Sequence, residues 1–234
     1  MNDVSAHRNA VVTGSSSGIG RAIAQTLLDA GWGVTGLDMA APGIAHARFK
    51  SVHADLADAA SLDAAASGLG PVHALVHAAG LLRLGRLGEL DHEAGGLMWR
   101  LHVQAASRLA NALAPAMAAT GEGRIVFIGS RVAHGMAGRG QYAATKAALI
   151  ALARSWAAEL APRGVTVNVV SPAATQTAMA QDPARSATAP KLPPIGRLIL
   201  PEEVAALVVF LLSPPAAAIT GQDIQNCGGS SLSS

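Results

Sequence analysis

The sequence predicts an α/β fold in which one parallel sheet is covered by helices on both faces. Short apolar runs alternate along the chain with segments of helical periodicity, and this alternation is typical of parallel sheets. Half of the 234 residues are hydrophobic but only 3% are aromatic. The core therefore has to be built mainly from closely packed Ala, Val, Leu and Ile.

Each expected strand is a short run of apolar, often branched, residues. The strands are expected at 9–13, 33–37, 49–54, 73–77, 124–129, 165–170 and 223–226. Helices are expected between them, where apolar residues recur with a period of about 3.6. They are expected at 21–28, 57–67, 88–95, 97–119, 141–160 and 201–212. No internal repeat or linker interrupts this order, so residues 1–234 are expected to form a single domain.

Composition excludes several classes of function. The formal charge is only +2 and the basic residues are scattered, which gives no indication of nucleic-acid binding. A single cysteine, Cys227, rules out an intrachain disulfide and a cysteine-rich zinc site, and we expect no bound metal. The first residues lack the apolar core of a signal peptide, and no apolar stretch is long enough to span a bilayer. We therefore expect a cytoplasmic protein.

A glycine-rich turn joins the first strand to the first helix. Gly14, Gly18 and Gly20 form a GxxxGxG pattern directly after the apolar run 9–13. Glycines permit positive φ and close backbone approach, and the N-terminus of the following helix attracts a pyrophosphate. This strand, turn and helix context favours nucleotide binding over a simple loop.

Two acidic residues follow consecutive expected strands. Asp38 follows the second strand, eighteen residues after Gly20. A carboxylate at this place accepts hydrogen bonds from a ribose 2′-hydroxyl and repels a 2′-phosphate, so NAD is favoured over NADP. The alternative is a solvated turn aspartate. Asp55 follows the third strand and is expected at the same ligand-binding edge of the sheet.

Tyr142, the only tyrosine in the chain, precedes Lys146 by four residues. On a helix these side chains share one face, and a nearby ammonium favours the phenolate form of tyrosine. Tyr142 is thereby suited to acid/base work. Taken alone, the pair is more typical of a surface tyrosine beside a solvated lysine. Ser130, delivered by the fifth strand to the same edge, favours a catalytic interpretation.

Together these motifs resemble the short-chain dehydrogenase/reductase family. The resemblance rests on Thr13-Gly14-x3-Gly18-x-Gly20, Asp55-Leu56, Ala79-Gly80, Ser130, Tyr142-x3-Lys146, Asn168, Ser171-Pro172 and Thr177. It covers nearly the whole chain in the family's order and spacing. It implies one Rossmann-type domain with a seven-stranded parallel sheet, and an NAD-dependent enzyme that interconverts a secondary alcohol and a ketone.

The resemblance also implies the cofactor-binding residues. The phosphates are assigned to the glycine turn, at Gly14, Ser16, Gly18, Ile19 and Gly20. The adenosine is assigned to Asp38, Asp55 and Leu56. Small residues at Ala79 and Gly80 leave room for a flat ring, and Thr177 is expected at the carboxamide. Lys146 is expected to hold the nicotinamide ribose, Tyr142 to exchange the proton, and Ser130 to hydrogen-bond the substrate oxygen.

Some positions depart from the family pattern. Asparagines are usual where His77 and Ala78 stand, glycine is usual at Ala173, and aspartate at Cys227. The most consequential departure is His102, which replaces the fourth catalytic residue, an asparagine that helps to hold a water in the proton relay. Histidine both donates and accepts, so the relay is either kept with an altered pH dependence or impaired.

The substrate is only partly indicated. Residues 78–85, 133–134 and 222–224 resemble the subgroup that oxidises 2,3-dihydro-2,3-dihydroxybenzoate. For a carboxylate substrate the candidate anchors are Arg83, Arg131 and Arg139. His134 either faces the substrate or is an ordinary loop histidine. Residues 173–200 lack a regular period and are expected to form a substrate lid.

Other functions remain open. A sugar or sugar-acid dehydrogenase and an oxoacyl reductase would use the same core residues, and a catalytically silent NAD-binding regulator is the alternative from another class. The family is mostly tetrameric, and the small residues Ala143, Ala147 and Ala151 would permit close helix packing. We therefore expect a homotetramer that binds a small-molecule substrate.

Overall fold

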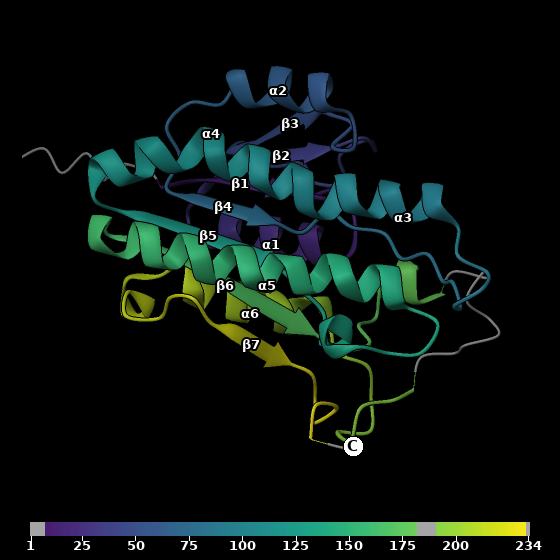
Figure 1. The fold of residues 1–234 in the computed structure, drawn as a ribbon. Helices are drawn as coiled ribbons and strands as arrows, with labels where there is room; N and C mark the ends of the chain where they lie inside the picture. The colour runs from purple at the N-terminus through teal and green to yellow at the C-terminus, as the bar shows by residue number, and fades with distance from the viewer. Residues whose placement is uncertain (1–7, 182–190, 233–234) are drawn as a thin grey trace, which may run out of the picture.

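The computed structural model describes residues 8–181 and 191–232. Seven parallel strands form one sheet in the order β3-β2-β1-β4-β5-β6-β7. The strands are β1 (Asn9–Thr13), β2 (Gly33–Asp38), β3 (Phe49–His53), β4 (Ala74–His77), β5 (Gly123–Ile128), β6 (Val165–Pro172) and β7 (Asp223–Asn226). Figure 1 shows this sheet between two layers of helices. The predicted fold class, a seven-stranded parallel sheet in a single domain, is confirmed.

The helices divide between the two faces of the sheet. They are α1 (Gly18–Asp29), α2 (Ala59–Ser67), α3 (His92–Trp99), α4 (Ala105–Thr120), α5 (Gly140–Leu160) and α6 (Pro201–Leu211). In Figure 1, α4 and α5 cover one face, while α1 and α6 lie side by side on the other. Short 3₁₀ turns include η2 (Arg131–His134), and a π-helical turn, η1 (Arg100–Gln104), joins α3 to α4.

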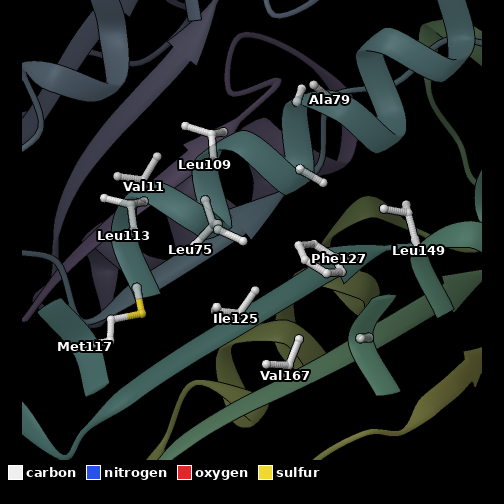
Figure 2. Packing of buried hydrophobic residues seen from close by; sticks show 14 of the residues in the cluster. Val11, Leu75, Ala79, Leu109, Leu113, Met117, Ile125, Phe127, Leu149 and Val167 are labelled. Atoms are coloured by element: carbon white, nitrogen blue, oxygen red, sulfur yellow. The ribbon is translucent and has the colours of Figure 1, made fainter. Parts of the chain in front are cut away.

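The sheet has a separate apolar core on each face because successive side chains of a strand point in opposite directions. Val11 of β1 packs with Phe127 of β5 and Leu109 of α4 on one face (Figure 2). Its neighbours Ala10 and Val12 belong to the cluster on the α1 and α6 face. Burial on both faces explains why the strands are nearly continuous apolar runs.

Strand order reverses beside β1, and this reversal fixes the place of the site. After β3 the chain crosses the sheet, so that β1 pairs with β2 on one side and β4 on the other. In open α/β sheets, ligands bind in the crevice at the carboxyl ends of the strands where the order reverses. The glycine turn and the ends of β4 and β5 therefore converge on one edge.

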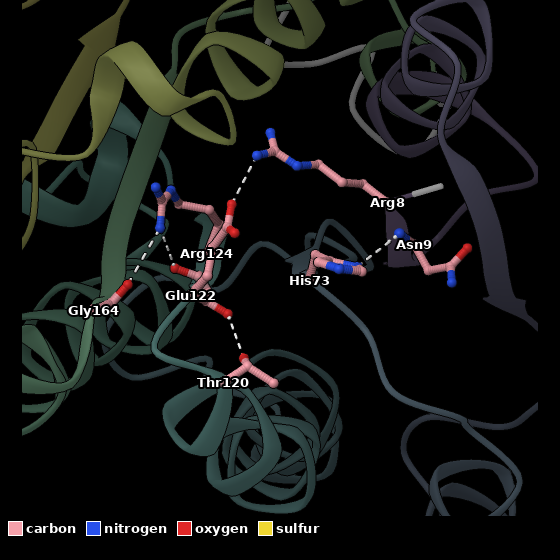
Figure 3. Close-up of polar contacts among 8 residues, drawn as sticks. Arg8, Asn9, His73, Thr120, Glu122, Arg124 and Gly164 are labelled. Atoms are coloured by element: carbon pink, nitrogen blue, oxygen red, sulfur yellow. Dashed lines mark hydrogen bonds and ion pairs between the residues drawn. The ribbon is translucent and has the colours of Figure 1, made fainter. Parts of the chain in front are cut away.

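Polar contacts hold the opposite end of the sheet, where the strands begin. Arg8 pairs with Glu122 at 2.8 Å, and the backbone N–H of Asn9 donates to His73 Nδ1 at 3.1 Å. Figure 3 shows these contacts beside the starts of β1 and β5. The second contact joins the starts of the neighbouring strands β1 and β4, and the first reaches past β4 to the start of β5, so these contacts have a structural role.

The expected helix at 88–95 is wrong. Gly88 lies in a turn with φ of 93°, and α3 begins only at His92, where Asp91 accepts a hydrogen bond from the N–H of Ala94. The expected break near residue 96 is also absent, since α3, η1 and α4 run on without interruption from 92 to 120. Gly95 packs closely against Gln141, and a Cβ there would force the amide end of that side chain to move.

The expected lid is described only at its flanks. Residues 182–190 lie outside the described part of the chain. The two flanks meet at a parallel bridge between Thr175 and Ile199. Over the described ranges, no helix is long and apolar enough to cross a membrane. Over the same ranges, no group of three or more His, Cys, Asp or Glu side chains is arranged to hold a metal ion.

Candidate active site

Two adjoining cavities open at the carboxyl edge of the sheet. The first, of about 350 Å³, is lined by Ser130 and Tyr142 and is called the tyrosine cavity. The second, of about 420 Å³, is lined by the glycine turn and is called the glycine cavity. Lining residues common to both are Ile19, Ala78, Gly80, Thr177 and Met179. One extended ligand can therefore occupy both.

The glycine turn forms the floor of the glycine cavity. Gly14 and Gly18 have φ values of 69° and 53°, which favour glycine. A Cβ on Gly14 would lie 2.9 Å from the Cα of Ala79, and one on Gly20 would clash with the carbonyl of Gly14. Among the described residues no side chain caps the start of α1 at Ser17. The N–H groups of its first turn can therefore bind an anion.

Asp38 is held rigidly at the wall of the glycine cavity. Its Oδ2 accepts from the N–H of Ser16 at 2.9 Å, and its Oδ1 accepts from the N–H of Ala40 at 2.9 Å. Each carboxylate oxygen keeps a second lone pair for a ligand hydroxyl. Asp55 and Leu56 line the same cavity. The described lining includes these two carboxylates and no Lys or Arg.

Ser130, Tyr142 and Lys146 meet at the tyrosine cavity. Ser130 follows β5, and its Oγ accepts from the N–H of Val132 at 3.2 Å, which leaves the hydroxyl proton for an oxygen in the cavity. Tyr142 and Lys146 lie one turn apart on α5, with Nζ 5.7 Å from the centroid of the phenol ring. The sequence-predicted triad is therefore assembled around one space.

Lys146 is buried, with 4% of its surface exposed. Its Nζ donates to the carbonyl oxygen of Ile128 at 2.8 Å. Burial disfavours the ammonium and lowers the pKa of Lys146 from 10.5 to about 7. The charge of this side chain can therefore change near neutral pH.

His102 lies in the π-helical turn and is fully buried. Its Nε2 accepts from the N–H of Leu81 at 3.0 Å, and its Nδ1 lies 2.8 Å from Thr145 Oγ1. The ring is edge-on to Tyr142, with centroids 5.6 Å apart. Burial, and next the charge of Lys146, hold the pKa of His102 well below 6.5. His102 is therefore neutral at physiological pH.

Known proteins resemble this chain over nearly its full length. A family model described as enoyl-(acyl carrier protein) reductase matches residues 14–231. The 3-oxoacyl-[acyl-carrier-protein] reductase of Vibrio harveyi is 36% identical, over 94% of this chain and 96% of its own. D-threitol dehydrogenase of Mycolicibacterium smegmatis is 34% identical, over 94% of this chain and 91% of its own.

Solved structures agree. A short chain dehydrogenase/reductase family protein superposes with a TM-score of 0.86 at 33% identity, covering 97% of this chain and 98% of its own. The chain belongs to the short-chain dehydrogenase/reductase family. A variant of actinorhodin polyketide ketoreductase, determined with NADPH, gives a TM-score of 0.88 at 28% identity, covering 96% and 97%. The protein is thus an oxidoreductase of CH–OH or carbonyl groups in a family that binds nicotinamide cofactors.

Other residues suggested by the family resemblance fall into two groups. Thr177 and Gly80 line both cavities, Ala79 lies behind the glycine turn, and Arg131 and Arg139 line the tyrosine cavity. By contrast, Arg83 is exposed, and its guanidinium donates to the carbonyl of Leu82 at 3.3 Å. The side chain of His134 is 68% exposed and lies 3.7 Å from Asp223. The described linings of the two cavities include neither Arg83 nor His134.

Sequence reasoning missed several residues of this short-chain dehydrogenase/reductase site. Met136 and Ser230 line the tyrosine cavity, and Lys191 from the expected lid adds a further basic side chain to it beside Lys146 and the two arginines. Thr145 bonds both His102 and the Tyr142 carbonyl. Its position three residues after the tyrosine, on nearly the same helix face, was the signal that could have identified it.

Proposed function

We propose that the protein is an NAD-dependent oxidoreductase that interconverts a secondary alcohol and a ketone on an anionic substrate. The observation that carries this proposal is the meeting of Ser130, Tyr142 and Lys146 at a cavity that continues into the glycine cavity. An acid/base group and a nucleotide-sized space are thereby adjacent, which is the arrangement that a hydride-transfer enzyme needs.

The glycine cavity fits a dinucleotide. Side chains at Gly14 or Gly20 would collide with backbone, and the uncapped start of α1 offers N–H donors to phosphate. Asp38, Asp55 and Leu56 would hold the adenosine half, and Thr177 with Lys146 the nicotinamide half. When bound, the nicotinamide would accept or donate the hydride.

The chain's own residues would handle the proton and the developing charge. Tyr142 would transfer a proton to or from the substrate oxygen, while the nearby ammonium of Lys146 favours the phenolate form of Tyr142. The hydroxyl proton of Ser130, whose oxygen already accepts from the N–H of Val132, would be donated to the same substrate oxygen. Because both side chains are held in place before the reaction, little reorganisation is needed at the transition state.

The charges around Asp38 support NAD rather than NADP. A 2′-phosphate would lie near an ionised carboxylate, and the described lining of the glycine cavity offers no Lys or Arg to neutralise it. The polyketide ketoreductase that this chain resembles was determined with NADPH. The choice of cofactor is therefore a proposal specific to this chain.

The charges of the tyrosine cavity support an anionic substrate. Its described lining contains Arg131, Arg139, Lys146 and Lys191 and no carboxylate. A small cyclic diol carboxylate such as 2,3-dihydro-2,3-dihydroxybenzoate would place its carboxylate on an arginine and its hydroxyl at Tyr142. The second candidate is reduction of an oxoacyl thioester, which is favoured by the 36% identity to 3-oxoacyl-[acyl-carrier-protein] reductase.

Two structural expectations belong to the same proposal. Residues 173–200 would act as the substrate lid, since Thr175, Met179 and Lys191 from its described flanks line the tyrosine cavity. A homotetramer would use the small, exposed side chains of Ala147 and Ala151 on α5 for close packing.

The test is a spectrophotometric screen at 340 nm with NAD and NADP across cyclic diols, sugar acids, oxo acids and oxoacyl thioesters. We expect turnover with NAD on an anionic substrate and its loss in Tyr142→Phe. A raised melting temperature with NAD but no turnover on any substrate would instead support a silent regulator. No thermal shift with either cofactor would contradict the whole proposal.

A further inference from the structure

His77, the buried last residue of β4, is fixed in one neutral tautomer. Its Nε2 lies 3.1 Å from the carbonyl oxygen of Leu101, which can only accept, so Nε2 carries the proton. Its Nδ1 lies 3.0 Å from Thr13 Oγ1. That oxygen accepts the N–H groups of Ala78 and Ala79, and its own proton is directed to Nδ1. His77 therefore joins the start of the site's π-helical turn to β1.

His102 is fixed in the opposite tautomer. The N–H of Leu81 donates to Nε2, so this nitrogen has no proton and the neutral ring carries its proton on Nδ1. Nδ1–H then donates to Thr145 Oγ1, and the Thr145 hydroxyl donates to the carbonyl oxygen of Tyr142 at 2.8 Å. A directed chain of three hydrogen bonds thus runs from the loop after β4 to the backbone of Tyr142.

We propose that His102 and Thr145 are positioning residues that clamp the first turn of α5, which carries Tyr142, onto the loop after β4, and that His102 carries no proton during turnover. To take up a proton at Nε2, the ring would have to release the N–H of Leu81, which would then be left without its acceptor. To pass on the Nδ1 proton, it would have to reverse the hydroxyl of Thr145. Either step breaks the clamp.

The surroundings of His102 favour the same conclusion. Lys146 on α5 and His77 on β4 are the titratable groups whose charges oppose its protonation, and the phenol ring of Tyr142 lies edge-on beside it. Burial is the largest effect and acts in the same direction. His102 therefore contributes no ionisation of its own to the pH profile near neutrality.

The kinetic part of this inference rests on the proposed function, but the tautomers do not. In uniformly ¹⁵N-labelled full-length protein, long-range ¹H–¹⁵N correlation spectra should show His102 as the Nδ1–H form and His77 as the Nε2–H form. Both should stay neutral from pH 5.5 to 8, with His102→Asn and His77→Asn used to assign the signals. An Nε2–H or doubly protonated His102 would overturn the clamp.

Steady-state kinetics then test whether His102 and Thr145 act as positioning residues. Asparagine also offers both a donor group and an acceptor group but takes up no proton, so His102→Asn should keep kcat within about fivefold and leave its pH profile unchanged. Thr145→Ser keeps the hydroxyl and should behave alike. Thr145→Val and His102→Leu remove the clamp and should lower kcat about tenfold or more, with a smaller change in the Kd for NAD.

The opposite pattern would overturn the proposal. If His102→Asn loses more than tenfold in kcat and its pH profile shifts, His102 is a proton carrier. If Thr145→Val keeps full activity, the clamp has no function. Should the wild-type protein turn over no substrate at all, the proposed function fails. The clamp is then still tested by the tautomers and by comparing the His102 signals of Thr145→Val with those of the wild type.

Discussion

Lys146 Nζ donates to the carbonyl oxygen of Ile128 at 2.8 Å, and this bond joins α5, which carries Tyr142, to β5, which leads into Ser130. Ile128 is the last residue of β5, two residues before Ser130, while Lys146 lies one turn after Tyr142 on α5. A buried ammonium thus holds the serine and the tyrosine at the same cavity. Its burial has a cost in stability, because charged groups are better solvated in water.

Lys146→Met should stabilise the fold. The pKa of Lys146 falls from 10.5 to about 7 on folding, so between pH 7 and 10.5 the unfolded chain binds more protons and wild-type stability rises with pH. The variant lacks this penalty and should gain about 4 kcal/mol at pH 7, less the contribution of the lost hydrogen bond. The gain should shrink toward pH 10.

Urea unfolding at pH 7 and pH 9.5 measures this effect. Lys50→Met, at an exposed position on β3, is the matched control and should change little at either pH. A Lys146→Met variant less stable than the wild type at pH 7 would contradict the conclusion that burying the Lys146 ammonium costs stability. The same variant should lose most of its turnover.

Asp38→Ala should relax the discrimination between the two cofactors. The substitution removes the carboxylate that would repel a 2′-phosphate and would bind the ribose hydroxyls. We expect kcat/KM with NAD to fall about tenfold and the NAD to NADP ratio to approach one. Steady-state kinetics with both cofactors measure this ratio. Asp29→Ala, at the exposed end of α1, is the control. An unchanged ratio would remove Asp38 from its proposed role.

Sequence could predict the sheet, and the meeting of Ser130, Tyr142 and Lys146 at one cavity, because both depend on local signals. Each strand is a short apolar run, and Asp38, Asp55 and Ser130 lie at the end of one or two residues beyond it, so parallel pairing brings them to one edge. The expected helix at 88–95 was wrong because Gly88 and the cap at Asp91 shift the start of α3 by four residues.

The parts of the site that sequence could not predict depend on contacts between residues far apart in the chain. The bond between His102 and Thr145 joins residues 43 positions apart, and it needs the π-helical turn to aim the ring. No local pattern marks such a turn. Likewise, Arg131 and Arg83 are indistinguishable as sequence, and only the packing of η2 brings the first of them to the tyrosine cavity.

Removing a cation from the tyrosine cavity should weaken binding of an anionic substrate. Arg139→Gln or Arg131→Gln keeps a polar side chain but loses the charge, so KM for a carboxylate substrate should rise about tenfold in at least one of them. The KM for its neutral methyl ester should change little. Arg83→Gln, outside both cavities, is the control. Equal effects on acid and ester would show that charge is not what the arginines supply.

His77 should make the protein sensitive to acid. Burial, and next the charge of Lys146, lower the pKa of His77 from 6.5 to about 3. Between these values the unfolded chain binds more protons than the folded one, so stability falls as the pH drops from 6.5 toward 3. His77→Asn removes this contribution, and although it also weakens the bonds to Thr13 and Leu101, those bonds do not depend on pH.

The test compares slopes rather than absolute stabilities. Between pH 7 and pH 5 the wild type should lose about 2 kcal/mol more than His77→Asn in urea unfolding. His53→Asn, at an exposed position on β3, is the control and should follow the wild-type curve. Parallel curves for wild type and His77→Asn would mean that His77 accepts a proton in the folded protein. Since Nδ1 accepts from Thr13 and Nε2 donates to Leu101, such protonation would require the bond from Thr13 to break.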